Sequence, residues 1–249
     1  EIVAAKLAEA GIKVNCFGSE VANWSMNPFK DEDFELCVAM LERALRRMAL
    51  LDCKIIRGMS FLWQLEYEPF DPEVEKQVFS KVAFLVKMCE DAGVVYGHEN
   101  CRNYGGQSPE HSLKLIEHID SPAFKLIFDT ANPVGTACRC GKEPYGNQDS
   151  LSFYRQVKEY IAYVHIKDAV VDLETGTRRC TFPGEGEAHV KEIVEDLLKS
   201  GYDGGFSIEP HIGGGPCRAA FDDPQGQAKF DSYIEYGQRF EKLVNTLKS

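Results

Sequence analysis

The chain has 249 residues, of which 44% are hydrophobic, 11% aromatic and 27% charged, a composition that can fill a large core and argues against disorder. Its formal net charge is −11, and Lys and Arg form no long block, so general attraction to nucleic acid or to an anionic membrane is not expected. No apolar stretch approaches the roughly 18 residues of a spanning helix, and the first residues lack the pattern of a secretory signal. We therefore expect a cytoplasmic protein.

The cysteines favour the same compartment. There are nine, scattered along the chain and odd in number, which predicts reduced thiols rather than a disulfide framework. The one close pair, Cys138 and Cys140, lacks a second pair or a histidine at finger-like spacing, so a structural zinc site is not favoured.

Short apolar segments alternate with longer segments of helical period, which indicates repeated βα units and a parallel sheet. Helices are expected over Asp33–Leu51 and Glu73–Ala92, and Gly11, Gly93 and Gly201 stand where a helix would end before the next strand. With no linker in view, residues 1–249 are expected to form one domain. The expected strands are Ile12–Phe17, Lys54–Arg57, Val94–Gly97, Lys125–Phe128, Tyr163–Ile166 and Phe206–Ile208.

An α/β barrel of the (β/α)8 TIM type suits this length and alternation, but it needs eight strands and only six are expected. Residue 1 is Glu, and Glu1–Ala10 has the pattern of the middle or end of an amphipathic helix without an N-cap. The hypothesis is that a leading β-α-β segment of roughly 30 to 50 residues is absent from the chain.

Four ionisable residues stand at the C-terminal ends of predicted strands: Glu99, Asp129, His165 and Glu209. In a parallel barrel these ends open on one face, so the four side chains can converge. Singly, each could be a capping acid or a packed histidine. Together, three carboxylates and an imidazole form an oxygen-rich set that predicts one divalent metal ion, with Mn²⁺, Mg²⁺ or Co²⁺ favoured and Zn²⁺ possible.

The order and spacing of five short motifs resemble the xylose isomerase-like TIM-barrel superfamily of sugar and sugar-phosphate isomerases and epimerases. The resemblance covers essentially the whole chain and is carried by His98-Glu-Asn100, Phe128-Asp-Thr-Ala-Asn132, Val164-His-Ile-Lys-Asp168, Pro183-Gly-Glu-Gly-Glu187 and Ser207-Ile-Glu-Pro-His211. It implies a single metal held by Glu99, Asp129, His165 and Glu209.

The mechanism that the resemblance implies is proton transfer beside a carbonyl through a metal-stabilised enediolate. Glu99 and Glu209 would then act on opposite sides of the planar intermediate, one removing a proton and the other returning one. The substrate would be a small sugar or polyol, and a homo-oligomer is expected.

Other residues near the motifs are candidates for substrate binding. Lys167 projects to the same side of its strand as His165, whereas Asp168 should point away and orient loops. Asn132 stands where some similar proteins carry a substrate-contacting histidine, which weakens a match to the 3-epimerases of that subgroup. Packing is preferred for His98. His211 and Glu185, the latter in a loop that could close over the site, complete the substrate-binding candidates.

Three other functions remain open. The same enolate chemistry can expel a hydroxyl, which would make the protein a dehydratase of a keto-inositol or related polyol. An apurinic endonuclease-like enzyme is less expected because the chain has only six histidines and no basic face for DNA. A catalytically inactive barrel acting as a binding protein is opposed by the complete ligand set.

Overall fold

The computed structural model describes residues 1–212 and 227–248; Cys217 lies outside the described residues. The chain divides into two compact units. Unit 1 comprises Glu1–Ile127, Arg139–Gly141 and Glu159–Tyr163, and unit 2 comprises Phe128–Cys138, Lys142–Lys158 and Val164–Ser249. No helix in the described ranges is both long and apolar enough to cross a membrane.

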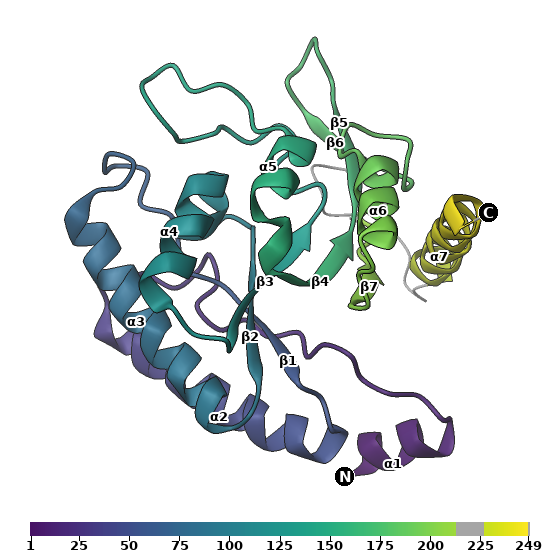
Figure 1. The fold of residues 1–249 in the computed structure, drawn as a ribbon, viewed down its shortest axis with the longest axis horizontal. Helices are drawn as coiled ribbons and strands as arrows, with labels where there is room; N and C mark the ends of the chain where they lie inside the picture. The colour runs from purple at the N-terminus through teal and green to yellow at the C-terminus, as the bar shows by residue number, and fades with distance from the viewer. Residues whose placement is uncertain (213–226, 249) are drawn as a thin grey trace. The chain divides into compact units, whose positions relative to one another are not determined.

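Five strands form a sheet in the order β1-β2-β3-β4-β7 (Figure 1). Two of its pairings are parallel: Ile55 of β1 lies opposite Val95 of β2, and Tyr96 of β2 lies opposite Phe124 of β3. All five strands were expected from the sequence to within one or two residues. Their bounds are β1 Ile55–Gly58, β2 Val95–Glu99, β3 Phe124–Asp129, β4 Ile161–Ile166 and β7 Gly205–Ile208.

The helices of unit 1 follow the apolar periodicity of the sequence, and α2 and α3 run side by side (Figure 1). The start of α3 is fixed by Asp71, whose carboxylate accepts hydrogen bonds from the backbone N–H groups of Glu73 and Val74, with Pro72 in the first turn. Both helices bury one face in a shared core that includes Leu41, Val82 and Tyr96. The bounds are α1 Ile2–Glu9, α2 Asp31–Leu51, α3 Pro72–Asp91, η1 Tyr104–Gln107 and α4 Pro109–Ile119.

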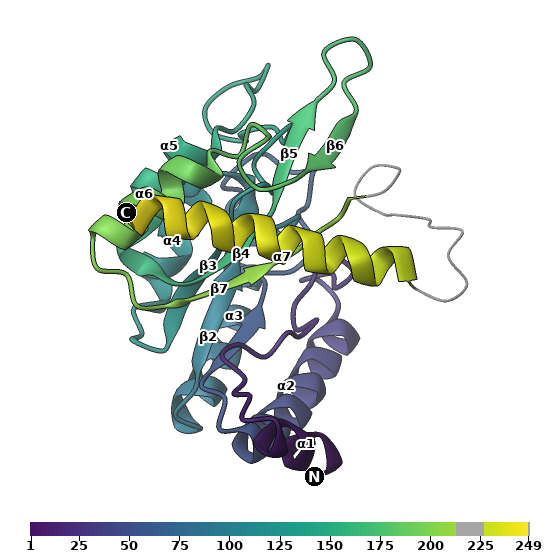
Figure 2. The same ribbon diagram turned by 90° about the vertical axis from the view of Figure 1, so that its right-hand side faces the viewer.

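Unit 2 carries the remaining helices and a hairpin. The α7 helix passes beside β7 and α6 (Figure 2), and a Cβ atom added at Gly237 would lie 3.5 Å from Ile208 Cδ1. The expected helix stops at Gly11, Gly93 and Gly201 are confirmed, since all three have φ between +64° and +79°. The bounds are α5 Ser150–Val157, η2 Lys158–Tyr160, β5 Asp168–Val171, β6 Arg178–Thr181, α6 Val190–Lys199 and α7 Gln227–Lys248.

The expected strand Ile12–Phe17 is wrong. Only Phe17 pairs, as an isolated parallel bridge with Ile56, in which Phe17 N–H donates to the Ile55 carbonyl at 2.8 Å. The N–H of Ile12 instead donates to the Leu7 carbonyl at the end of α1, and the Ile12 side chain is 58% exposed. Val14 and Phe17 still pack against the core, but the segment lacks the hydrogen-bonded ladder that a strand requires.

The antiparallel hairpin β5–β6 was not expected from the sequence. Asp168 lies opposite Thr181 and Val171 opposite Arg178, with the turn between them at Asp172–Thr177. Its strands are four residues long and only half-buried at their outer ends, so they lack the continuous apolar run that marks the other strands.

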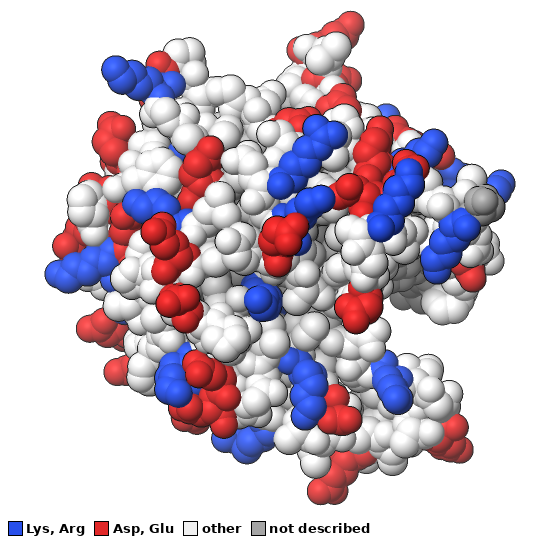
Figure 3. Space-filling model, in the orientation of Figure 1, with Lys and Arg blue, Asp and Glu red and all other residues white. Residues whose placement is uncertain are grey.

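Charged side chains of both signs alternate over the face drawn in Figure 3, where Lys and Arg gather in no basic patch.

Acid should destabilise unit 1 through His111, which is fully buried against Phe70. Burial, with Arg139 and Lys114 nearby, lowers its pKa to about 3. Between its ordinary pKa and pH 4 the unfolded chain binds a proton that the folded chain does not, so stability falls as pH falls, by about 3 kcal/mol.

Denaturant unfolding at pH 7, 6, 5 and 4 measures this loss. We expect His111→Phe, which keeps an aromatic ring against Phe70, to flatten the decline, and His118→Phe on the same helix is the matched control. An unchanged decline in His111→Phe would contradict the assignment.

Candidate metal centre

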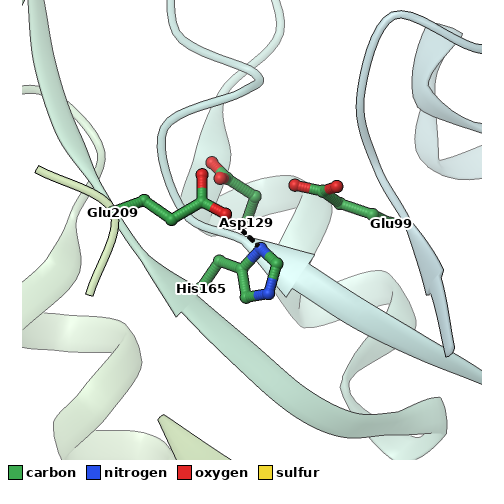
Figure 4. Close-up of side chains that lie close together, drawn as sticks. All are labelled: Glu99, Asp129, His165 and Glu209. Atoms are coloured by element: carbon green, nitrogen blue, oxygen red, sulfur yellow. Dashed lines mark ion pairs between the residues drawn. The ribbon is translucent and has the colours of Figure 1, made fainter. Parts of the chain in front are cut away.

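Three of the predicted ligands lie at strand ends in unit 2. Asp129 is the last residue of β3, His165 is near the end of β4, and Glu209 follows β7 directly. Asp129 is fully buried and His165 is 5% exposed. His165 Nδ1 lies 2.9 Å from Glu209 Oε1, and Figure 4 shows the two side chains turned toward one another.

The backbone fixes Asp129 through its own loop. Its Oδ1 atom accepts hydrogen bonds from Ala131 N–H at 2.9 Å and Asn132 N–H at 2.8 Å. Thr130, the residue after Asp129, connects this loop to the end of β4. Its N–H donates to the His165 carbonyl at 3.1 Å, and its hydroxyl donates to the Lys167 carbonyl at 2.5 Å. The ends of β3 and β4 are thus held in one arrangement, which is how this chain orients two of the predicted ligands.

Lys167 is the cation of this group. Its Nζ lies 2.7 Å from Asp129 Oδ2 and 3.1 Å from Glu209 Oε2, and its side chain is only 8% exposed. Burial by itself raises the pKa of Glu209, but the Lys167 ammonium and hydrogen bonds from His165 and His211 outweigh burial and hold that pKa well below its usual range. Glu209 is therefore ionised near neutral pH.

Glu99 ends β2 in unit 1 and is 2% exposed. Its backbone carbonyl accepts a hydrogen bond from Asn103 Nδ2 at 2.9 Å, and its Oε2 atom lies 3.4 Å from Arg57 Nη1. Arg57 is itself oriented by the Ser19 carbonyl, which accepts from Nη2 at 2.9 Å. A carboxylate so deeply buried requires such a partner.

The residues with metal-binding side chains form one group. Each of its members offers one ligand atom, and these atoms all lie within 4.8 Å of one another (Figure 4); the members are Glu99, Asp129, His165 and Glu209. Carboxylate oxygens with one imidazole nitrogen suit Mg²⁺, Mn²⁺ or Co²⁺, and they also tolerate Zn²⁺. The donor set therefore fits a single divalent cation, whose identity it leaves open.

A buried polar network lies behind Glu99 in unit 1. Ser60 Oγ lies 2.9 Å from His98 Nε2 and donates to Asn103 Oδ1 at 2.8 Å, and all three residues are fully buried. Burial lowers the pKa of His98 to about 4, so the imidazole is neutral. The packing role expected for His98 is confirmed, and Asn103 links this network to the Glu99 backbone.

Asp168, the first residue of β5, organises the loop that follows the hairpin, the role expected from its direction away from His165 and Lys167. Its carboxylate accepts hydrogen bonds from the N–H groups of Ala169, Gly184, Gly186 and Ala188 at 2.8 to 3.1 Å. A side chain at position 186 has no room, since its Cβ would lie 2.2 Å from Asp168 Oδ1. Burial raises the pKa of Asp168 although these four donors oppose the rise.

We expect Asp168→Ala to lower the free energy of unfolding by about 3 kcal/mol, because the substitution leaves buried N–H groups without their acceptor. Asp172→Ala is the control, since Asp172 also accepts from two backbone N–H groups but is exposed, and its loss should cost far less free energy of unfolding. Urea unfolding of the two variants measures the difference, and equal losses would contradict the role given to Asp168.

The other substrate-binding candidates are dispersed around this group. His211 Nε2 lies 3.6 Å from Glu209 Oε2. Asn132 follows Asp129 in the loop described above. Glu185 is exposed and forms an ion pair with Arg239 Nη1 at 2.6 Å, so within unit 2 it contacts α7. Their roles in binding substrate stay predictions.

Arg57 was missed from the sequence, although a signal existed. It stands at the end of the expected strand Lys54–Arg57, the same position type that singled out the four ligands. A charged residue at the end of a barrel strand is a candidate functional residue whatever the sign of its charge, but an arginine is not a metal ligand and so does not match the pattern of the other four.

A family model described as a xylose isomerase-like TIM barrel matches residues 1–229. This chain belongs to that family. The TIM-barrel fold expected from the sequence is confirmed, and the five-stranded sheet in the described ranges is part of it.

Solved structures agree on the fold. A D-tagatose 3-epimerase-like protein is 18% identical with a TM-score of 0.73, and the match covers 99% of this chain and 82% of the other. A xylose isomerase-like TIM barrel protein from Mycobacterium smegmatis in complex with magnesium is 17% identical with a TM-score of 0.69, covering 98% of this chain and 77% of the other.

Among curated proteins, the inosose dehydratase of Geobacillus thermodenitrificans is 25% identical over 177 residues, which cover 61% of this chain and 54% of that protein. The chain spans about half the length of the curated relatives it matches.

Proposed function

We propose that the protein is a divalent-metal-dependent isomerase or epimerase of a sugar or sugar phosphate. The observation that supports the proposal most is the group formed by Glu99, Asp129, His165 and Glu209, whose ligand atoms lie within 4.8 Å of one another. These four residues would hold the ion. When bound, a divalent cation supplies Lewis acidity, polarising a carbonyl and stabilising the negative charge that develops when the neighbouring carbon loses its proton.

The chain's own residues would move the proton. Glu209 is held ionised by Lys167, His165 and His211, so it can accept a proton from carbon, and Glu99 would return one from the other side of the planar intermediate. Return to the same carbon gives epimerisation, and return to the adjacent carbon gives isomerisation. Lys167, Asn132, His211 and Glu185 are the residues proposed to bind substrate hydroxyl, carboxylate or phosphate groups.

The test is a panel of ketoses, ketose phosphates and inososes in deuterated solvent with Mn²⁺ present. We expect deuterium to enter the pool of at least one substrate at a carbon beside the carbonyl, detected by NMR or mass spectrometry. Absence of exchange across the panel, from protein shown to bind the metal, would reject the proposed proton transfer.

A dehydratase of a keto-inositol or related polyol is the second candidate, because a curated relative at 25% identity is an inosose dehydratase. Both reactions begin with proton removal beside a carbonyl and differ in the next step. Elimination removes one water from the substrate, so the mass of the product measured in ordinary water separates the two reactions. A product 18 Da lighter than the substrate indicates the lyase. A product of the same mass, with hydrogen exchange in deuterated solvent, indicates the isomerase or epimerase.

We also propose that residues 1–249 act as one domain of a cytoplasmic homo-oligomer on a small-molecule substrate. The supports are the composition, the acidic charge, the family, and the match in fold to a D-tagatose 3-epimerase-like protein. Mass determination in solution at several protein concentrations would test the oligomeric state.

A further inference from the structure

Lys167 occupies a position in unit 2 that substrate binding does not explain. Its ammonium lies 2.7 Å from Asp129 Oδ2 and 3.1 Å from Glu209 Oε2, so it contacts two carboxylates that belong to the ligand group itself. The Asp129 side chain is fully buried, and that of Glu209 is 22% exposed. A cation in such contact with two acids replaces much of the hydration that they lose on burial.

The backbone places this ammonium. Thr130 accepts a hydrogen bond from Lys167 N–H at 3.1 Å and donates to the Lys167 carbonyl at 2.5 Å, which fixes the residue relative to the Asp129 loop. On the other side, the adjacent Asp168 is anchored by four backbone N–H groups. The backbone of Lys167 is thus fixed by the Thr130 hydrogen bonds on one side and by the anchored Asp168 on the other, which directs its ammonium toward Asp129 and Glu209.

The consequence of removing Lys167 follows from charge. Asp129 and Glu209 would then face each other as two anions in a buried place without their shared cation, which is costly at low dielectric constant. A bound divalent ion would relieve the same repulsion. Lys167 and the ion would therefore neutralise the same pair of carboxylates, and the ammonium would repel the ion that binds beside it.

We propose that Lys167 is the resident counter-cation of Asp129 and Glu209, whose ammonium holds these two carboxylates in place in the metal-free protein. The same ammonium repels a divalent ion, so it stabilises the metal-free site and weakens metal binding. The inference rests on the proposed metal site and goes beyond the substrate-binding role expected from the sequence. Lys167 is in this sense a positioning residue.

The test is Lys167→Met, which keeps a long side chain and removes the charge. At pH 7.5 we expect the melting temperature of the chelator-treated protein to fall by at least about 5 °C. We also expect the Mn²⁺ dissociation constant, measured by calorimetry, to fall at least about tenfold, because loss of the repelling ammonium outweighs the looser ordering of two side chains. By linkage, Mn²⁺ must then raise the melting temperature more in the variant than in the wild type.

Two further variants define the charge effect. Lys167→Arg keeps the cation, so its metal-free melting temperature should stay closer to the wild type than that of Lys167→Met. Lys158→Met removes a lysine that also pairs with a carboxylate, Asp196 at 3.2 Å, but with both side chains far more exposed than Lys167 and Asp129, and it should change neither quantity appreciably.

Should Lys167→Met alone yield no folded protein, the double variant Lys167→Met with Asp129→Asn decides. Removing one anion together with the cation should give a protein that folds and melts near the Asp129→Asn single variant. A double variant that also yields no folded protein, or that melts well below the Asp129→Asn single variant, would overturn the counter-cation role.

The outcomes also separate this inference from the proposed function. If wild-type protein binds no Mn²⁺, the proposed metal site fails, while the metal-free stability of Lys167→Met still tests the counter-cation. If Lys167→Met leaves both the metal-free stability and the Mn²⁺ affinity unchanged and only raises KM, Lys167 is a substrate ligand and the inference is overturned.

Discussion

Glu209→Gln is expected to lower the rate of solvent exchange at the substrate carbon on the order of 10³-fold, within the range that general acid–base groups contribute. The amide keeps the shape of the side chain and one oxygen that can still face a metal ion, but it cannot accept a proton from carbon. The carboxylate of the wild type is ionised and has a free lone pair for that proton, because Lys167, His165 and His211 outweigh the effect of burial on its pKa.

The measurement that isolates this role is a pair of values for each protein, the exchange rate at saturating Mn²⁺ and the Mn²⁺ dissociation constant. We expect the variant to bind Mn²⁺ more weakly but to remain nearly inactive when the site is saturated. The control is Glu235→Gln, whose carboxylate is also exposed and paired with Arg239 but has no proposed role in the site, and whose exchange rate should fall far less. Full activity of Glu209→Gln at high Mn²⁺ would exclude Glu209 as a proton-transfer group.

The sequence could predict that the four candidate ligands come together, because the position of each on its strand, rather than a side-chain contact, defines them. Glu99, Asp129, His165 and Glu209 each stand at a strand end, and the strands themselves are visible as short apolar runs. Parallel topology then brings the ends to one face, so no side-chain geometry is needed to place them together.

The partners of these ligands could not be predicted in the same way. Lys167 was expected to project to the same side as His165; it lies between β4 and β5, and its pairing with Asp129 and Glu209 depends on side-chain rotamers and on the Thr130 hydrogen bonds. The strand expected at Ile12–Phe17 failed for a related reason: its apolar pattern is that of a strand, yet only Phe17 finds a partner, and a ladder is a property of two segments.

The loop held by Asp168 shows an intermediate case. Its outward direction follows from strand alternation, and the sequence correctly assigned it to orienting loops. Which loop it holds depends on the hairpin β5–β6, which returns the chain to Gly184 and Gly186, and the short strands of that hairpin have no apolar run strong enough to predict it.

Asp129→Asn should separate metal binding from proton transfer. We expect the substitution to weaken Mn²⁺ binding on the order of 10²- to 10³-fold, because the number of charged ligands sets the affinity of such sites. Asp129 Oδ1 already accepts from the N–H groups of Ala131 and Asn132, so Oδ1 of the new amide must stay with these donors and its NH₂ group takes the place of Oδ2 beside Lys167. That orientation removes the anionic oxygen that the ion would share with Lys167.

Calorimetric titration with Mn²⁺ and exchange assays over a range of Mn²⁺ concentrations measure the two effects. Asp129→Asn should lose activity in proportion to its loss of bound metal and regain much of it at millimolar Mn²⁺, whereas Glu209→Gln should not recover, because its missing group acts on the proton. Asp149→Asn, an exposed N-cap of α5, is the control for the chemical change. If Asp129→Asn bound Mn²⁺ as tightly as the wild type, Asp129 would not be a ligand, and the charge balance between Lys167 and the metal would have to rest on Glu209 alone.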